Sequence, residues 1–255
     1  MKTEAGRSAR QDANMVAFGV VMVMALSLIG LSACSRRSDT GGSTNTAVTP
    51  GDAVPSPPAS PAVTAGGAVP PLLADAGEFG ENVYDYAKAT DWKNADAMLA
   101  ALKATVEQLR TPMTTQSAEQ SRLEEDVLTL DRAVTARDRR AAMRGANQVT
   151  RDVADMTATY RPPVPVEVTR LDYYGRELEI WAEANDVPKL HETARAMRRE
   201  WDVVRSAVEA RSAVKAERFG ALVARVEKAR TPAGFARLAK PVLDEVDNLE
   251  KVFQP

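Results

Sequence analysis

Cysteine and histidine are almost absent from this sequence of 255 residues, which contains one residue of each, Cys34 and His191. A single cysteine cannot form an intramolecular disulfide, and it excludes structural zinc or iron–sulfur sites built from several thiolates. His191 and Glu192 begin a string typical of zinc proteases, but Arg195 stands where the second histidine ligand would be. We therefore expect no metal site and no cofactor.

An excess of basic residues is also lacking, since 33 lysines and arginines stand against 35 aspartates and glutamates. The two signs are interspersed, so no basic stripe is available to neutralise nucleic-acid phosphates. The sequence has no glycine-rich phosphate loop and no nucleophile elbow. These absences predict a protein that is not an enzyme and does not bind nucleic acid.

The N-terminal segment has the order of a secretory signal, with basic residues followed by an apolar run from Met15 to Leu31. The run ends in Leu31-Ser32-Ala33-Cys34. This tetrapeptide resembles the lipobox of bacterial lipoprotein precursors. The resemblance covers residues 1–34 and implies that residues 1–33 are a signal peptide, removed before Cys34, whose thiol carries the lipid.

An uncleaved membrane helix is the alternative for the same apolar run, because about twenty apolar residues can span a bilayer. Arg36 and Arg37 would then favour a cytoplasmic location for that end. If the chain is a lipoprotein, Ser35 is the residue after the lipidated cysteine. A serine rather than an aspartate at this position resembles lipoproteins that enteric bacteria sort to the outer membrane. We expect a lipid-anchored protein of the cell envelope that faces the periplasm or exterior, with the outer membrane favoured.

Residues 34–76 form a second compositional region, rich in Gly, Ser, Thr, Pro and Ala. Such a segment buries too little apolar surface to offset the entropy of ordering it. We predict a disordered tether that separates the folded body from the lipid.

A fourfold repeat organises the remaining sequence, with Asp91, Asp138, Asp186 and Thr231 at equivalent positions 45 to 48 residues apart. Each of these residues can accept hydrogen bonds from the free amides of a helix that follows it, and an alanine stands two positions before each. Each repeat therefore predicts a helix, a tight turn and a second helix.

Apolar residues occupy the same six offsets (4, 8, 11, 15, 18 and 22) after the capping residue in all four repeats. In the third repeat they are Leu190, Ala194, Met197, Trp201, Val204 and Val208. Alternating steps of four and three residues are typical of helices that wind left-handedly around one another. We predict an all-α protein in which four helical hairpins form two antiparallel, left-handed four-helix bundles; an α-solenoid of helix pairs is the alternative.

The proline-rich string from Arg161 to Pro165 predicts the boundary between a first bundle at residues 77–160 and a second at residues 166–255. No proline separates the third hairpin from the fourth. Their helices could therefore be continuous between Pro188 and Arg230.

A haem site across a bundle is the main alternative to a body without cofactors, since His191 could combine with a methionine. The candidate methionines are Met98, Met113, Met143, Met156 and Met197. Three of them, Met113, Met156 and Met197, lie at apolar offsets of the repeat, where core packing explains them. His191 itself is expected to be exposed on the first turn of a helix.

Several residues outside the apolar offsets could form a surface for a partner. Trp92 and the pair Tyr173-Tyr174 are expected to pack at the bundle ends, although partly exposed aromatic residues are also frequent at interfaces. The charged groups Glu124 to Asp126 and Arg195, Arg198 and Arg199 are expected on solvated helix faces, with partner binding by the arginines as the alternative.

Together these features predict a non-catalytic helical interaction or structural module, anchored in the cell envelope, whose partner is an envelope protein or a second copy of itself. The alternative function is a helical bundle that binds haem, a metal or a small apolar ligand. The body resembles no characterised family.

Overall fold

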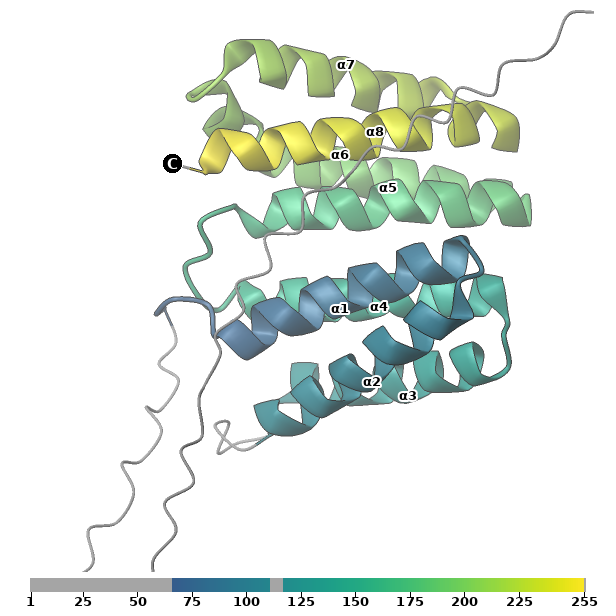
Figure 1. Ribbon diagram of the computed structural model, residues 1–255. Coiled ribbons are helices and arrows are strands. Elements are labelled where there is room, and N and C mark those ends of the chain that lie inside the picture. Colours follow the sequence, from purple (N-terminus) through teal and green to yellow (C-terminus); the bar gives the residue numbers. More distant parts are fainter. Residues whose placement is uncertain (1–65, 111–116, 255) are drawn as a thin grey trace, which may run out of the picture. The chain divides into compact units, whose positions relative to one another are not determined.

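The computed structural model describes residues 66–110 and 117–254. Cys34, the signal peptide and most of the predicted tether lie outside these residues. Eight helices make up the described part of the chain (Figure 1). They are α1 (Pro71–Lys88), α2 (Trp92–Leu109), α3 (Ala118–Thr135), α4 (Arg139–Thr157), α5 (Val166–Ala184), α6 (Val187–Glu209), α7 (Ala213–Lys228) and α8 (Pro232–Phe253).

The predicted all-α class and its four helical hairpins are confirmed. The side chains of Asp91, Asp138, Asp186 and Thr231 each accept a hydrogen bond from the backbone amide three residues later. Such caps satisfy amides that have no partner inside the helix. Local chemistry therefore fixes where the second helix of each hairpin begins.

The first three turns also share a backbone conformation. Thr90, Arg137 and Asn185 precede the capping aspartates and have φ between 56° and 58°. The amide of each capping aspartate donates back to a carbonyl in the preceding helix, at Tyr86, Ala133 and Trp181. A left-handed residue with this hydrogen bond ends a helix and reverses the chain within a few residues.

Two boundaries differ from the prediction. Helix α1 begins at Pro71 rather than at residue 77, because Pro71 stands at the first helical position and Leu73 and Ala76 are buried in the core. The third and fourth hairpins are separate, since Ser212 caps α7 after α6 has ended at Glu209.

Helix packing divides the eight helices into two groups of four. In the first group α1 contacts α2 and α4, and α3 contacts α4; in the second, α5 contacts α6 and α8, and α7 contacts α6 and α8. A solenoid would stack successive hairpins without the contacts of α1 with α4 and of α5 with α8 that close each group. These pairings agree with four-helix bundles, and their handedness stays a prediction.

Each group has its own hydrophobic core, formed by the residues at the apolar offsets of the repeat. Every apolar offset residue within the described chain is buried, apart from Tyr160 and Phe253 at the helix ends, which are half-buried. Trp201 is fully buried, and its ring centroid lies 5.0 Å from that of Phe219. The hydrophobic cores therefore follow the sequence repeat.

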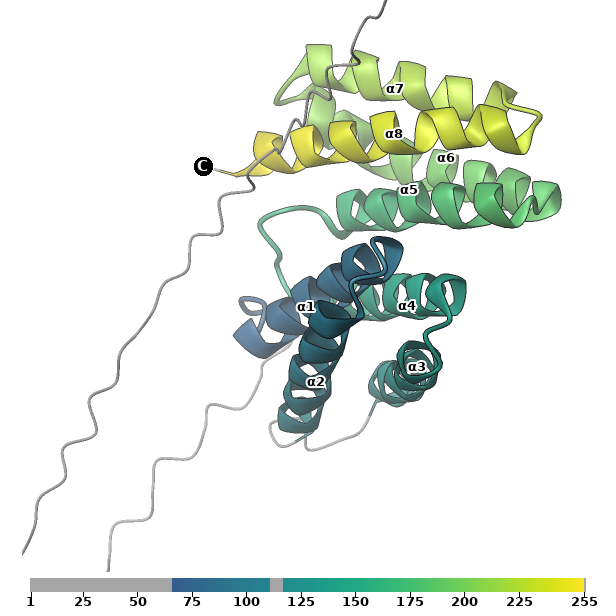
Figure 2. The ribbon, with the colours of Figure 1, turned by 45° about the vertical axis from the view of Figure 1, so that its right-hand side comes forward.

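The two groups meet along α4 and α5 (Figure 2). Ile180 of α5 is fully buried in the core of the first group, and Trp181 packs against both cores. Ion pairs surround these apolar contacts, including Lys88–Glu179 at 2.6 Å and Arg139–Glu183 at 2.5 Å. The junction between the groups combines a small apolar contact with many charged residues.

Candidate functional site

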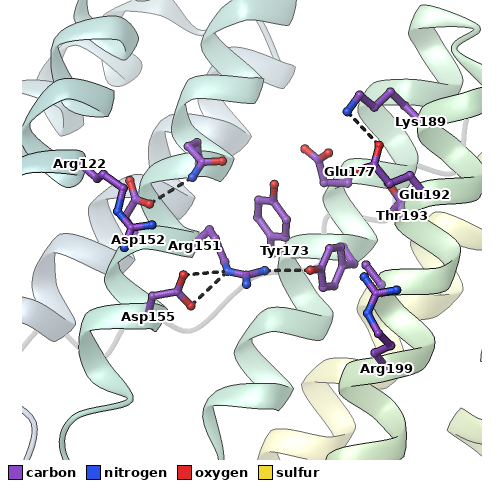
Figure 3. Close-up of a pocket in the computed structure, with 13 residues that line it drawn as sticks. Arg122, Arg151, Asp152, Asp155, Tyr173, Glu177, Lys189, Glu192, Thr193 and Arg199 are labelled. Carbon is purple, nitrogen blue, oxygen red and sulfur yellow. Dashed lines mark hydrogen bonds and ion pairs between the residues drawn. The ribbon is translucent and has the colours of Figure 1, made fainter. Parts of the chain in front are cut away.

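The candidate site is a cavity of about 380 Å³ between α4, α5 and α6, where the two helical groups meet (Figure 3). Helix α4 contributes Asp152 and α5 contributes Tyr173 and Glu177, while α6 contributes Lys189 and Arg199. A neighbouring cavity of about 620 Å³ shares Gln148, Tyr173, Glu177 and Lys189 with the first. We call the two together the junction groove.

One wall of the junction groove is held by a network around Arg151. Arg151 donates to both carboxylate oxygens of Asp155 at 3.2 Å and to the Tyr174 hydroxyl at 2.9 Å. Arg170 of α5 also donates to Asp155, at 2.8 Å. The guanidinium of Arg151 lies 5.4 Å from the ring centroid of Tyr173. Because these contacts join α4 to α5, the wall is held in place before any ligand arrives.

Two polar groups of the groove have no hydrogen-bonding or ionic partner in the described chain. The Tyr173 hydroxyl and the Arg199 guanidinium make no hydrogen bond or ion pair with residues 66–110 or 117–254. Tyr173 is half-buried and Arg199 is exposed. Figure 3 shows Tyr173 at the centre of the groove and Arg199 on the adjacent helix α6. Both groups are therefore free to contact a ligand.

The floor of the groove carries carboxyl groups that are partly or fully removed from solvent. Asp152 is only 4% exposed; its Oδ1 accepts from Gln148 at 3.1 Å, and its Oδ2 accepts from no donor among the described residues. Burial and the neighbouring carboxyl of Asp126 raise the pKa of Asp152 to about 7. The floor thus holds a carboxyl group that carries a proton at mildly acidic pH.

Glu177 is the second acidic group of the floor. It accepts hydrogen bonds from the Trp181 indole and from Asn147, the latter at 3.3 Å. Burial raises the pKa of Glu177. Across the neighbouring cavity, the guanidinium of Arg144 lies 5.8 Å from the Trp181 ring centroid. Charged and aromatic groups therefore alternate along the groove.

The sequence predicted some of these residues but not their arrangement. Tyr173 and Tyr174 line the groove between the helical groups, so the expectation that they pack at bundle ends is wrong. Of the three arginines noted on α6, Arg199 lines the groove and Arg195 is exposed on a helix face. Arg198 instead pairs with Glu227 of α7 at 2.6 Å.

The acidic residues 124–126, which were expected on a solvated helix face, are only partly exposed. Glu124 pairs with Arg110 at 2.7 Å, Glu125 is exposed, and Asp126 is half-buried in the groove. Trp92 packs on the edge of the first core, with the guanidinium of Arg137 5.5 Å from its ring.

His191 is half-buried rather than exposed, because its ring packs edge-on against Phe235, with centroids 5.5 Å apart. Met143, Met156 and Met197 are buried in the hydrophobic cores and Met98 packs against the first, whereas Met113 lies outside the described residues. No group of three or more histidine, cysteine, aspartate or glutamate side chains in the described chain could hold a metal ion. None of the helices α1 to α8 is long and apolar enough to cross a bilayer.

The sequence did not indicate the groove residues Gln148 and Asp152, because neither lies at an apolar offset of the repeat. The only signal for this part of the groove was Asp126, which replaces an aromatic residue that three of the repeats share at the same offset, at Phe79, Tyr174 and Phe219.

The fold and the groove together define an all-α protein of helical hairpins with a polar, aromatic cavity at the junction of its two helical groups. Comparison of the chain with models of protein families, with curated proteins and with solved structures finds no match.

Proposed function

We propose that this protein is a non-catalytic helical interaction module that binds a segment of another cell-envelope protein in the junction groove. The observation that carries the proposal is that one wall of the groove is held by hydrogen bonds between its own side chains, while two polar groups beside it have no hydrogen-bonding partner. Arg151, Asp155 and Tyr174 hold one another in place, whereas the Tyr173 hydroxyl and Arg199 have no partner in the described chain. A preorganised surface loses little conformational entropy when a partner binds.

The composition of the groove supports a protein partner. Tyrosine, tryptophan and arginine are enriched at protein interfaces, and Tyr173, Trp181, Arg144 and Arg199 supply all three types here. A lining this rich in charge does not favour the small apolar ligand considered as an alternative. A second copy of the chain is the other partner that the same experiments would detect.

The proposed location follows from the N-terminal sequence. Leu31-Ser32-Ala33-Cys34 at the end of an apolar run supports a lipid anchor on Cys34, and Ser35 favours the outer membrane. The anchor would hold the helical body at a membrane surface, facing the periplasm or exterior, where envelope proteins are accessible to it.

Replacement of Cys34 tests the anchor. We expect Cys34→Ala to abolish incorporation of radioactive palmitate and to leave the unprocessed precursor, because the thiol that receives the lipid is gone. The measurement is autoradiography of the protein isolated from labelled cells, with Ser32→Ala as a processed control. Labelling of the Cys34→Ala protein at the wild-type level would contradict the anchor.

Photo-crosslinking tests the groove. We expect a photoreactive phenylalanine analogue in place of Arg199 to crosslink to another protein in intact cells, because that side chain points into the groove without a partner of its own. The same analogue at Arg205, which is exposed on α6 away from the groove, is the matched control. The crosslinked product is identified by mass spectrometry.

Binding of the identified partner then tests the contact. We expect Arg199→Glu to weaken the affinity at least about tenfold, equivalent to roughly 1.4 kcal/mol, while Arg205→Glu has little effect. Both residues are exposed, so neither substitution should change the melting temperature appreciably. Equal crosslinking at the two positions, or equal affinities, would reject the groove as the binding surface.

A further inference from the structure

The hairpin repeat places opposite charges at equivalent points of three hairpins. An acidic residue stands fourteen positions after the capping residue in the second, third and fourth hairpins, at Asp152, Glu200 and Glu245. A basic residue stands sixteen positions before the capping residue in the same hairpins, at Arg122, Arg170 and Lys215. The repeat therefore provides one residue of each sign on the two helices of each of these hairpins.

In the third and fourth hairpins the two residues form an ion pair. Arg170 lies 3.7 Å from Glu200, and Lys215 lies 3.8 Å from Glu245. The basic side chains are largely covered, with exposed fractions of 20% for Arg170 and 29% for Lys215. Each of these carboxylates, which are buried or half-buried, thus has a cation from its own hairpin.

The second hairpin lacks this ion pair. Asp152 pairs with no basic residue of the described chain and its Oδ2 accepts no hydrogen bond there, although only 4% of the residue is exposed. Arg122 instead pairs with Glu119 of its own helix at 3.4 Å, and 56% of its side chain is exposed. An aspartate is also one methylene shorter than the glutamates at the equivalent positions, so its carboxyl group reaches less far toward the facing helix.

The unpaired carboxyl group lines the junction groove, at the cavity of about 380 Å³ between α4, α5 and α6. Burial is the main reason why the pKa of Asp152 rises to about 7, and the charge of Arg122 opposes this rise from beyond ion-pair distance. A buried carboxylate without a partner is costly. A cation that enters the groove from outside the chain would remove this cost.

The basic residues of the groove surround this place rather than fill it. They are Arg122, Arg132, Arg144, Arg151, Lys189 and Arg199. All but Arg151 are exposed to solvent, which screens their charges, and Arg151 is held by Asp155. Six acidic residues line the groove as well, and four of them are buried or half-buried: Asp126, Asp152, Asp155 and Glu177. The groove therefore has an acidic floor and a mostly basic rim.

We propose that Asp152 binds a lysine or arginine side chain of the partner segment, whose cation takes the place that Arg170 and Lys215 occupy in the following hairpins. This inference rests on the proposed function for the use of the groove, and it adds the chemistry of the partner. Acidic residues on either side of that basic residue complement the exposed arginines of the rim, among them Arg199. The Tyr173 hydroxyl, at the centre of the groove, is available to the same segment (Figure 3).

A small cation tests the site without the partner. The ion n-propylguanidinium reproduces the end of an arginine side chain, and N-propylurea has a similar shape without the charge. At pH 8, where the Asp152 carboxyl group is ionised, we expect n-propylguanidinium to bind the full-length protein in the millimolar range. It should shift the NMR signals of the Asp152 backbone amide and of the Gln148 side-chain amide, which donates to Asp152 at 3.1 Å. N-propylurea should leave both signals in place.

Two variants assign the binding to Asp152. Asp152→Asn keeps the shape of the side chain but removes its charge, so it should abolish the shift of the Gln148 signal. Glu245→Gln removes the equivalent charge in the fourth hairpin, where Lys215 and Arg218 already pair with it, and should leave binding unchanged. Circular dichroism checks that both variants fold. No shift in the wild type, equal shifts with both compounds, or an undiminished shift in Asp152→Asn would overturn the inference.

The partner identified by crosslinking at Arg199 provides the second measurement. We expect Asp152→Asn to weaken its binding at least about tenfold. Replacement of the basic residue of the crosslinked segment by methionine should weaken binding to the wild type equally, and should cause no further loss in the Asp152→Asn variant. Wild-type affinity of Asp152→Asn for the partner would reject the role of Asp152 and leave the proposed function intact. Binding of n-propylguanidinium at Asp152 without any crosslinked partner would support the cation site and reject the proposed function.

Discussion

Trp201→Ala is expected to destabilise the protein by about 3 to 5 kcal/mol, the usual cost of removing a large aromatic side chain from a core. Trp201 is fully buried in the second helical group, with its ring 5.0 Å from that of Phe219. Its truncation leaves a cavity between α6 and α7 that the rigid helices can fill only in part. Chemical denaturation monitored by circular dichroism measures the loss in the free energy of unfolding.

Arg205→Ala is the appropriate control, because Arg205 is an exposed residue of the same helix and makes no ion pair with the described residues. Its effect should stay within about 0.5 kcal/mol. Arg198, which the sequence also predicted on a solvated face, is unsuitable because its ion pair with Glu227 joins α6 to α7. Similar small losses for Trp201→Ala and Arg205→Ala would mean that the apolar offsets are not the core.

Trp201→Ala also tests how far the two helical groups unfold independently. The proline-rich connection at residues 161–165 predicts partial independence, so residues 166–254 should lose more amide protection than the first group. The buried contact of Ile180 with the first core limits this difference. Hydrogen exchange measured for each helix separates the two contributions.

Arg176→Ala is expected to cost about 3 to 5 kcal/mol as well, because it breaks a buried ion pair and leaves carboxylates without their partner. Arg176 is only 8% exposed and pairs with Asp172 at 3.1 Å and with Glu81 at 3.5 Å. Its guanidinium also lies 5.1 Å from the ring centroid of Tyr84. One side chain of α5 thus connects the two helical groups.

The loss for Arg176→Ala should be larger at pH 8 than at pH 5. Burial raises the pKa values of Asp172 and Glu250 to about 7, and the positive charge of Arg176 opposes that rise. Without Arg176 these groups hold protons to still higher pH in the folded state, so stability falls more steeply as the pH increases. Denaturation at both pH values measures the difference.

Arg195→Ala removes an exposed arginine from α6 and provides the matched control, with an expected effect within about 0.5 kcal/mol at either pH. A loss for Arg176→Ala that is equally small, or independent of pH, would show that the buried pair does not stabilise the junction.

Local chemistry made much of the fold predictable from sequence. The capping residues Asp91, Asp138, Asp186 and Thr231 marked the turns, since an N-cap acts within one helical turn of itself. The buried face of each helix was equally predictable, because burial of one helix face requires apolar residues at a fixed spacing. For the same reason the sequence located Trp201 in the core without any knowledge of its neighbours.

The errors occurred where a residue depends on a neighbour distant in sequence. His191 was expected to be exposed, but its ring packs on Phe235 of α8. Tyr174 was expected at a bundle end, but its hydroxyl accepts a hydrogen bond from Arg151 of α4. Residues 71–76 have the composition of the tether, yet Leu73 and Ala76 become helical because a core is available to bury them.

The sequence by itself determined the helices, the hairpins and the apolar faces of this protein, because hydrogen-bonded turns and helical periodicity act over a few residues. The tertiary structure alone decided that α4 packs on α5 and that Ile180 and Arg176 are buried at that junction. These pairings depend on how helices pack side by side, and a repeat that gives every hairpin the same apolar face does not specify which polar faces meet.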